Sequence, residues 1–432
     1  MRTRYRWVVV GIIFMGSMLG YLDRTAFGVA APMIANEFGL SPLQMGFLFS
    51  AFFAGYALFG LVGGFAADRF GSHKVIIAAA LVWSLFCGLT ATAGGFALLL
   101  IVRMIFGMGE GPWAPSINKL VSRWFPRDEQ ASAMGFSLSS QPLGAALAGP
   151  VVGLVAVAYG WRVSFIAIAL LGICWVAIWA LLVCDYPEHS RHVGDKERAY
   201  VVEARINVET RDAPSSSTLA TILRADVLSV VAAWFGYSYI LFFFLSWFPT
   251  YMVTARHLDI KSMAILSVWP WTLGFIGHAG SGFLTDALYR WLGDPRLARK
   301  IVLCSAMGVA ALAVGFSSLV ASVGLAVVLL SVMIFCLDLS ASTPWALLLD
   351  TVEQDKIGRV SGFGLCVASL AGIVAPALTG WIVQATGSFV GAFVLAGAIA
   401  FIGASSVAVF VRKRRVAPTI AADHALMPNI QH

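Results

Sequence analysis

The sequence predicts an all-α membrane protein whose twelve transmembrane helices form two six-helix bundles related by a pseudo-twofold axis. Of its 432 residues, 59% are hydrophobic and only 12% are charged, whereas about a quarter of the residues in soluble domains are charged. Twelve apolar stretches follow one another, each long enough to cross a bilayer as a helix of about 20 residues. One long polar stretch separates the first six from the last six.

A helix is expected in each apolar stretch. The strands of a membrane β-barrel would alternate in hydrophobicity over about ten positions, and a helix is the remaining way to satisfy the backbone in lipid. The first stretch is not expected to be a cleaved signal peptide, because Asp23 and Arg24 stand where small residues would precede the cleavage site. The predicted spans lie near residues 7–27, 46–67, 74–94, 96–118, 130–153, 161–184, 226–250, 262–285, 299–319, 322–346, 359–383 and 388–411.

Both chain termini are expected in the cytoplasm. Nearly all of the 29 Lys and Arg residues fall in the terminal segments and in the loops on the same side of the predicted spans. The loops on the opposite side hold only Arg162, Arg256 and Lys261. Cytoplasmic loops carry this excess of basic residues, so the net charge of +7 reflects membrane topology and not nucleic-acid binding. We therefore expect a multi-pass protein of the cell membrane.

Short sequences recur in the same order in the two halves of the chain. The Gly, Phe and Asp of residues 64–68 recur in residues 282–286, and Gly135-Phe136 recurs as Gly362-Phe363. Secondary transporters are often built from such repeats, with their binding site at mid-membrane. The expected domains are an N-terminal bundle (residues 1–184), a cytoplasmic linker (185–225), a C-terminal bundle (226–411) and a disordered cytoplasmic tail (412–432).

Several motifs resemble the major facilitator superfamily and, within it, the anion:cation symporter family of sugar-acid, phthalate-type and vesicular anion carriers. The superfamily's two signatures are matched by Gly64-x-x-x-Asp68-Arg69-x-Gly71-x-x-Lys74 and by Arg103-x-x-x-Gly107-x-Gly109. The anion:cation symporter family is matched by Tyr21-Leu22-Asp23-Arg24, Arg103-x6-Glu110 and Trp124-Phe125-Pro126. We expect a monomeric carrier that works by alternating access.

Five ionisable residues are predicted inside the membrane: Asp23, Arg24, Arg103, Glu110 and Asp338. Each such charge costs about 2.5–3.5 kcal/mol at the centre of a bilayer on insertion scales, which favours a functional role. An arginine fork can hold a carboxylate through two hydrogen bonds. Protonation of a neighbouring acid would free that arginine for an anion. The alternative is that the charges only neutralise one another.

The resemblance assigns roles to these charges and to the pocket around them. It implies proton coupling at Asp23 and Glu110, and anion binding or charge pairing at Arg24 and Arg103. It also implies that the cavity is lined by Tyr56, Gln141, Ser342 and Trp345, for which helix packing is the alternative. Asp338 shares a helical face with Ser342 and Trp345 by spacing, and is either a third titrating group or a satisfied buried acid. His278 is expected to be an ordinary core residue.

The loop signature predicts a conformational latch. Asp68 is expected at a helix end, where a carboxylate can cap a neighbouring helix and pair with a basic residue. Such a pair can hold one conformation of the bundles and break in the other. The residues concerned are Gly64, Asp68, Arg69, Gly71 and Lys74. Simple anchoring of basic residues at the cytoplasmic surface is the alternative.

The C-terminal half departs from the family pattern that the sugar-acid carriers share. Many of those members carry Phe-Asn-x-x-x-Asn on the eleventh span, but this chain has Leu365 and Ser369 in place of the two Asn residues. The seventh span is instead aromatic, with Tyr237 and Trp247 among its side chains. Unmet buried hydroxyls cost about 1–3 kcal/mol each. This shifts the expected substrate toward an aromatic or less hydroxylated carboxylate.

We therefore predict a secondary active transporter that takes up an organic carboxylate by proton symport. The alternatives are a proton-coupled antiporter or exporter, and a membrane sensor that binds the anion without moving it. No metal-ligand or nucleophile pattern stands out in the spans, so an enzyme is not expected, and neither is a cofactor other than protons. The expected partners are the anion and the lipid bilayer. The six cysteines lie in or at the ends of spans and are expected to act as small apolar residues.

Overall fold

The computed structural model describes residues 4–206, 218–353 and 356–411, and these residues are helical throughout, apart from short connections. The predicted disordered tail, residues 412–432, lies outside the described residues. The first half contains α1 Tyr5–Phe38, α2 Pro42–Phe70, α3 Ser72–Leu89, α4 Phe96–Glu110, α5 Trp113–Trp124, α6 Arg127–Ala148, α7 Val155–Tyr159 and α8 Trp161–Leu182, with a π-helical turn at Gly149–Leu154 between α6 and α7.

The linker contributes two short helices, and the second half repeats the long ones. The linker helices are α9 Asp195–Ile206 and α10 Thr218–Ile222. The second half contains α11 Ala225–Thr254, α12 Ile260–Leu266, α13 Val268–Leu292, α14 Pro295–Ser317, α15 Val323–Leu339, α16 Thr343–Thr351, α17 Ile357–Thr386 and α18 Val390–Phe410. The exact limits of the four predicted domains remain a prediction.

Local sequence sets the helix ends at several turns. Gly39 ends α1 in the left-handed conformation (φ 61°), which glycine adopts without strain. Ser41 then begins α2, where Ser41 and Gln44 form reciprocal side-chain caps and Pro42 takes the first helical position. Asp294 caps α14 with its carboxylate, which accepts hydrogen bonds from the Arg296 and Leu297 backbone amides.

Eleven helical segments of the described chain are long and apolar enough to cross a membrane. They correspond to all the predicted spans except the eighth, whose residues form α12 and α13. With 25 residues, α13 is long enough to span, but it carries His278, Asp286 and Arg290 and is therefore less apolar than the others. It packs closely against α15 and α6, as a twelfth long helix of the fold.

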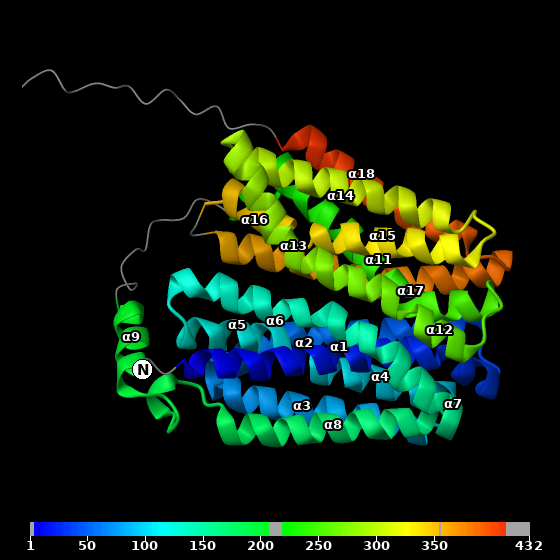
Figure 1. The fold of residues 1–432 in the computed structure, drawn as a ribbon, viewed down its shortest axis with the longest axis horizontal. Helices are drawn as coiled ribbons and strands as arrows, with labels where there is room; N and C mark the ends of the chain where they lie inside the picture. The colour runs from blue at the N-terminus through cyan, green and yellow to red at the C-terminus, as the bar shows by residue number, and fades with distance from the viewer. Residues whose placement is uncertain (1–3, 207–217, 354–355, 412–432) are drawn as a thin grey trace, which may run out of the picture.

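The two halves use the same helix pairings. In the first half, α2 packs on α4, α1 on α6 and α3 on α8; in the second half, α13 packs on α15, α11 on α17 and α14 on α18. Figure 1 shows the first half below and the second half above, with α9 at the end of the molecule that carries the N-terminus. The repeated pairings confirm the predicted pseudo-twofold arrangement of two bundles.

The halves contact each other at the end away from the N-terminus. There α1 meets α11, α2 meets α17 and α6 meets α13. The Ser50 hydroxyl on α2 donates a hydrogen bond to the Ile373 carbonyl on α17 at 2.6 Å. Gly46 lies against the same helix so closely that a Cβ there would stand 2.7 Å from the Pro376 carbonyl oxygen. Close backbone contacts and aromatic pairs between the halves, such as Phe49 with Trp247, therefore seal this end.

The opposite end, near the N-terminus, lacks this packing. A Cβ added to Gly135 on α6, Gly282 on α13 or Gly362 on α17 would meet no atom within 4 Å. Large side chains beside these glycines stay exposed, such as Phe136 (50% exposed) and Phe283 (81% exposed). The described structure is therefore open between its halves on the side of the chain termini and closed on the other side.

Candidate functional site

A buried ion pair lies at the centre of the first half. The Arg24 guanidinium on α1 donates a hydrogen bond from Nη2 to Glu110 Oε1 on α4 at 2.8 Å. The two residues are 6% and 5% exposed. Gly20, one turn before Arg24, leaves room for the acid, since a Cβ at that position would stand 3.1 Å from Glu110 Oε1. The sequence predicts charged residues here, and the structure shows which two of them pair.

Aromatic rings surround both buried arginines. The Arg24 guanidinium carbon lies 4.8 Å from the ring centres of both Tyr21 and Tyr56, on opposite helices α1 and α2. The Arg103 guanidinium lies 4.3 Å from the ring centre of Phe27 and 4.8 Å from that of Phe52. Ring faces attract cations at such distances. The rings hold the guanidiniums in place without occupying their hydrogen-bond donors.

Several polar atoms of this cluster have no hydrogen-bond partner among the described residues. They are Asp23 Oδ1, Arg24 Nε, Arg103 Nε and Glu110 Oε2. Asp23 and Arg103 are each 2% exposed, and neither forms an ion pair within the described chain. Buried polar groups are normally paired. The cluster therefore has spare donors for an anion and spare acceptors for protons.

The structure places Tyr56 beside Arg24, whereas Gln141 forms no hydrogen bond with the ion pair in the described residues. Gln141 lies half-buried on α6, directly before Pro142 within that helix. It has no side-chain hydrogen bond among the described residues. An amide side chain in that position has both donors and an acceptor available for a polar ligand.

The tenth span bends between Asp338 and the two predicted pocket residues that follow it. Helix α15 ends at Leu339, a turn occupies residues 340–342, and α16 begins at Thr343. Asp338 is 3% exposed, whereas Trp345 is 46% exposed and packs edge-on against Trp234. Ser342 is exposed and shares a 2.7 Å hydrogen bond with Ser281. The regular helical spacing that predicts a common face for Asp338, Ser342 and Trp345 is therefore interrupted by this turn.

Asp338 has two neighbours that the sequence did not reveal. The Tyr237 hydroxyl on α11 donates to Asp338 Oδ1 at 3.4 Å, and His278 Nδ1 on α13 lies 3.5 Å from the same oxygen. His278 was expected to be an ordinary core residue, and its position beside a buried acid makes it a candidate site residue. No sequence motif links these three positions, because they come from three different helices.

The loop signature forms its contacts within the first half. Lys119 Nζ on α5 lies 2.6 Å from Asp68 Oδ1. Asp68 does not cap the next helix. Instead, Asp185 Oδ1 accepts from the His73 amide at the start of α3 and from Arg123 Nη1, each at 3.1 Å. The predicted capping role therefore belongs to Asp185, which sequence spacing could not bring to this loop.

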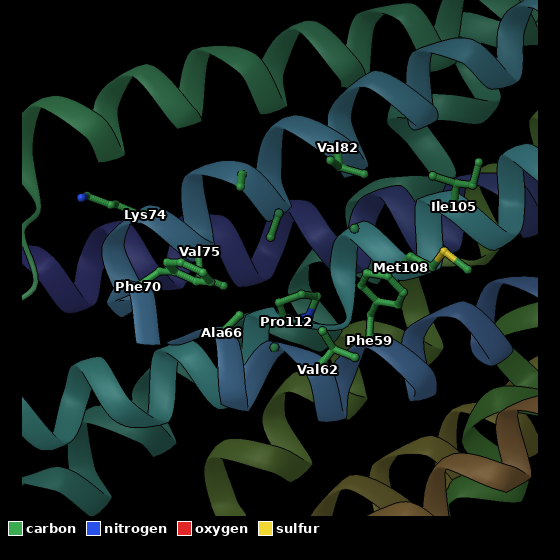
Figure 2. A pocket seen from close by; sticks show the side chains of 14 residues that line it. Phe59, Val62, Ala66, Phe70, Lys74, Val75, Val82, Ile105, Met108 and Pro112 are labelled. Carbon is green, nitrogen blue, oxygen red and sulfur yellow. The ribbon is translucent and has the colours of Figure 1, made fainter. Parts of the chain in front are cut away.

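A separate apolar cavity of about 570 Å³ lies between α2, α3 and α4. Figure 2 shows Phe59, Val62, Val82 and Met108 around it, with Lys74 at one end as its only charged lining residue. None of the five predicted intramembrane charges lines it. The cavity therefore lacks the chemistry needed to bind a carboxylate and is distinct from the charged cluster.

Comparisons with known proteins agree with this architecture. The chain is 42% identical to the hexuronate transporter of Bacillus subtilis (strain 168), with 94% of each chain covered. It is 32% identical to a probable sulfoacetate transporter of Cupriavidus necator, with 93% of each covered. It is 28% identical to the D-galactonate transporter of an Escherichia coli O6:H1 strain, with 93% of this chain and 95% of that one covered.

The fold itself matches solved structures. A crystal structure of a bacterial homologue of the human lysosomal transporter Spinster, inward-facing and occupied, superposes with a TM-score of 0.74 at 18% identity. The match covers 95% of this chain and 98% of that one. Residues 13–376 match the Major Facilitator Superfamily as a sequence family. The protein is a multi-pass membrane transporter that belongs to the Major Facilitator Superfamily and is related to carriers of sugar acids and other organic anions, and it is not an enzyme.

Proposed function

We propose that the protein imports a sugar-acid carboxylate, of the hexuronate class, together with protons by alternating access. The observation that carries this proposal is the buried pair of Arg24 and Glu110, each of which keeps one buried polar atom without a partner. A purely structural ion pair would be expected to use these atoms, because leaving them unpaired is costly. A carboxylate ligand and a proton are the two species that would satisfy them.

Exchange of partners at Arg24 explains how the two species are coupled. While Glu110 is ionised, it occupies the guanidinium at 2.8 Å. When Glu110 takes up a proton, the attraction disappears and Arg24 is left with uncompensated charge in a buried place, which costs several kcal/mol. A substrate carboxylate relieves that cost through a bidentate contact. Asp23, buried with a free oxygen one residue away, is a further proton acceptor in the same cluster.

Membrane energetics favour this coupling. An anion that enters a negatively charged cell alone works against about 2.3 kcal/mol per 100 mV. One accompanying proton cancels that charge, and a second would add electrical drive. The assignment of Asp23 and Glu110 to protons and of Arg24 and Arg103 to the anion is part of the same proposal.

The relatives support the substrate class. The names of the three relatives above refer to hexuronate, sulfoacetate and galactonate, all small organic anions. The 42% identity to a hexuronate transporter outweighs the loss of the two amides at Leu365 and Ser369. Leu365 is 51% exposed and Ser369 bonds its own helix backbone. In place of the missing amides, Tyr56, Gln141 and Ser342 would form the hydrogen bonds to the hydroxyl groups of the substrate.

We further propose that the carrier functions as a monomer in the cell membrane, with both termini in the cytoplasm. The distribution of basic residues supports this orientation. In that orientation, the side that is open between the halves faces the cytoplasm, and the end sealed by Gly46 and Ser50 faces outward. The described conformation would then be the one that releases substrate into the cell.

Uptake of labelled glucuronate into proteoliposomes tests the proposal. An inward-directed proton gradient should drive accumulation, and Arg24→Gln should abolish it. Glu37→Gln is a matched control, because it breaks an exposed Glu–Arg pair, with Arg162, outside the cluster. Accumulation driven only by an outward-directed proton gradient would indicate antiport instead. Saturable binding without accumulation would indicate a sensor, and either result would overturn the proposal.

A further inference from the structure

The fourth span of each half is interrupted near its middle. In the first half, α4 ends at Glu110 and α5 begins at Trp113; in the second half, α15 ends at Leu339 and α16 begins at Thr343. Both complete spans, Phe96–Trp124 and Val323–Thr351, contain 29 residues. Glu110 is the last residue of α4, and Asp338 is the last but one of α15. Asp338 is therefore the counterpart of Glu110 in the second half.

The two acids differ in their neighbours. Glu110 is neutralised by Arg24, whereas Asp338 has no Lys or Arg partner within the described chain. Its Oδ1 receives the Tyr237 hydroxyl and faces His278 Nδ1, and its Oδ2 is buried without a partner. Gly274 on α13 leaves space for that oxygen, since a Cβ there would stand 2.6 Å from Oδ2. A buried carboxylate without a cation is most stable when it binds a proton.

Two tyrosines connect this acid to the ion pair of the first half. Tyr21 on α1 lies close enough to interact electrostatically with Arg24 and Glu110 on one side and with Asp338 on the other. Tyr237 interacts with both Asp338 and Tyr21. The titratable groups that face Asp338 are thus His278 from α13, Tyr237 from α11 and Tyr21 from α1. Of these, Tyr21 belongs to the first half, and His278 and Tyr237 belong to the second.

We propose that Asp338 and His278 form a second proton-binding site in the C-terminal half, which is loaded together with the Glu110 site in each transport cycle. The proton resides on the Asp338 carboxylate while the site is closed to water. His278, whose ring is partly exposed (18%), passes it to and from the open side. This inference rests on the proposed symport. It adds that one proton shared by Glu110 and Asp23 and a second on Asp338 accompany each monovalent anion, so that uptake carries one net positive charge inward.

Charge movement distinguishes this proposal from symport of one proton at the Glu110 and Asp23 cluster alone. Proteoliposomes with the full chain are given a valinomycin-set potassium potential, negative inside, at equal pH on both sides. The wild-type protein should accumulate labelled glucuronate in response to the potential. Asp338→Asn, which mimics the permanently protonated acid, should lose that response and keep uptake driven by a pH gradient. Asp259→Asn is the control, because it changes an exposed helix-capping acid outside the spans and leaves the capping function in place.

The outcomes separate the two proposals. If wild-type uptake ignores a pH gradient, the proposed symport itself fails. If a pH gradient drives wild-type uptake but the potential does not, or if Asp338→Asn keeps the full response to the potential, only the second proton site is overturned. Should Asp338→Asn fail to fold, as judged by size-exclusion chromatography, His278→Gln provides the test. Compared with the wild type, it should reduce uptake driven by the potential more than uptake driven by the pH gradient. An equal reduction of both would overturn the proposal.

Discussion

The Arg24 guanidinium on α1 and the Glu110 carboxylate on α4 meet at 2.8 Å, although 86 residues separate them in the sequence and both are buried. Removing one member of a buried pair leaves the other charge uncompensated and costs about 3–5 kcal/mol. A carrier can use the same energy to link proton binding to anion binding. The relationship between these two residues therefore defines the first experiments.

Glu110→Gln should separate binding from coupling. Glutamine has the shape of the protonated acid but no charge, so Arg24 stays free for the substrate at every pH. We expect glucuronate binding to be retained or strengthened and proton-driven accumulation to be lost. Isothermal titration in detergent and uptake into proteoliposomes measure the two properties. Normal accumulation by this variant would remove Glu110 from the coupling role, and Glu37→Gln should behave like the wild type.

Arg24→Lys should weaken anion binding although the charge is kept. The ammonium of lysine is a point charge that cannot form the two parallel hydrogen bonds of a guanidinium. A hydrogen bond to a charged group contributes about 1.5–3 kcal/mol, which corresponds to an affinity loss of about 10- to 100-fold. Titration with glucuronate measures it. Arg162→Lys, in the exposed pair with Glu37, is the matched control. An unchanged affinity would argue against direct contact between Arg24 and substrate.

Leu365→Asn should favour hydroxylated substrates if position 365 faces the substrate path. The change restores one of the amides that many sugar-acid carriers have on this span. We expect glucuronate uptake to rise relative to uptake of benzoate, an aromatic acid without hydroxyls. Leu370→Asn places the same amide at another exposed position on α17 and should leave the preference unchanged. Equal behaviour of the two variants would contradict a role for Leu365 in selectivity.

Gly46→Ala should shift the conformational equilibrium. The added Cβ would stand 2.7 Å from the Pro376 carbonyl oxygen, so the closed end cannot form without displacement of α17. We expect a cysteine introduced at Leu43 to react faster with a maleimide, because the sealed end opens more often. Gly11→Ala serves as the control, since a Cβ there meets nothing within 4 Å. Unchanged reactivity would show that Gly46 does not restrict opening.

Asp185→Ala should destabilise the first half. Its carboxylate accepts the His73 amide at the start of α3 and an Arg123 donor. Loss of a capping carboxylate costs about 0.5–2 kcal/mol of unfolding free energy, so the thermal transition in detergent should move to a lower temperature. Asp195→Ala, whose side chain is 97% exposed, should have little effect. The same transition temperature for both variants would exclude the capping role.

Hydrophobic stretches in the sequence predict most of the fold, because lipid demands long apolar helices with satisfied backbones. The span that hydropathy identifies least well is α13, which carries His278, Asp286 and Arg290. The same stretches expose the intramembrane charges as candidates. Asp23, Arg24, Arg103 and Glu110 indeed lie buried, and Arg24 and Glu110 pair.

Contacts between distant helices could not be predicted from the sequence. His278 and Tyr237 approach Asp338 only because α11, α13 and α15 pack together. Asp185 follows α8 in the sequence, and it contacts the start of α3 because α8 ends beside that helix. Helical spacing places Asp338 and Trp345 on one face, but a turn intervenes before α16, where Pro344 stands in the first helical turn.

The closed end of the molecule joins its two halves through close contacts at glycines, the Ser50 hydroxyl and aromatic side-chain pairs, and no ion pair between α2 and α17 contributes to it in the described residues. Dissolved ions screen attractions between charges but hardly affect close packing. The rate at which this end opens should therefore be nearly the same in dilute and in salty solution.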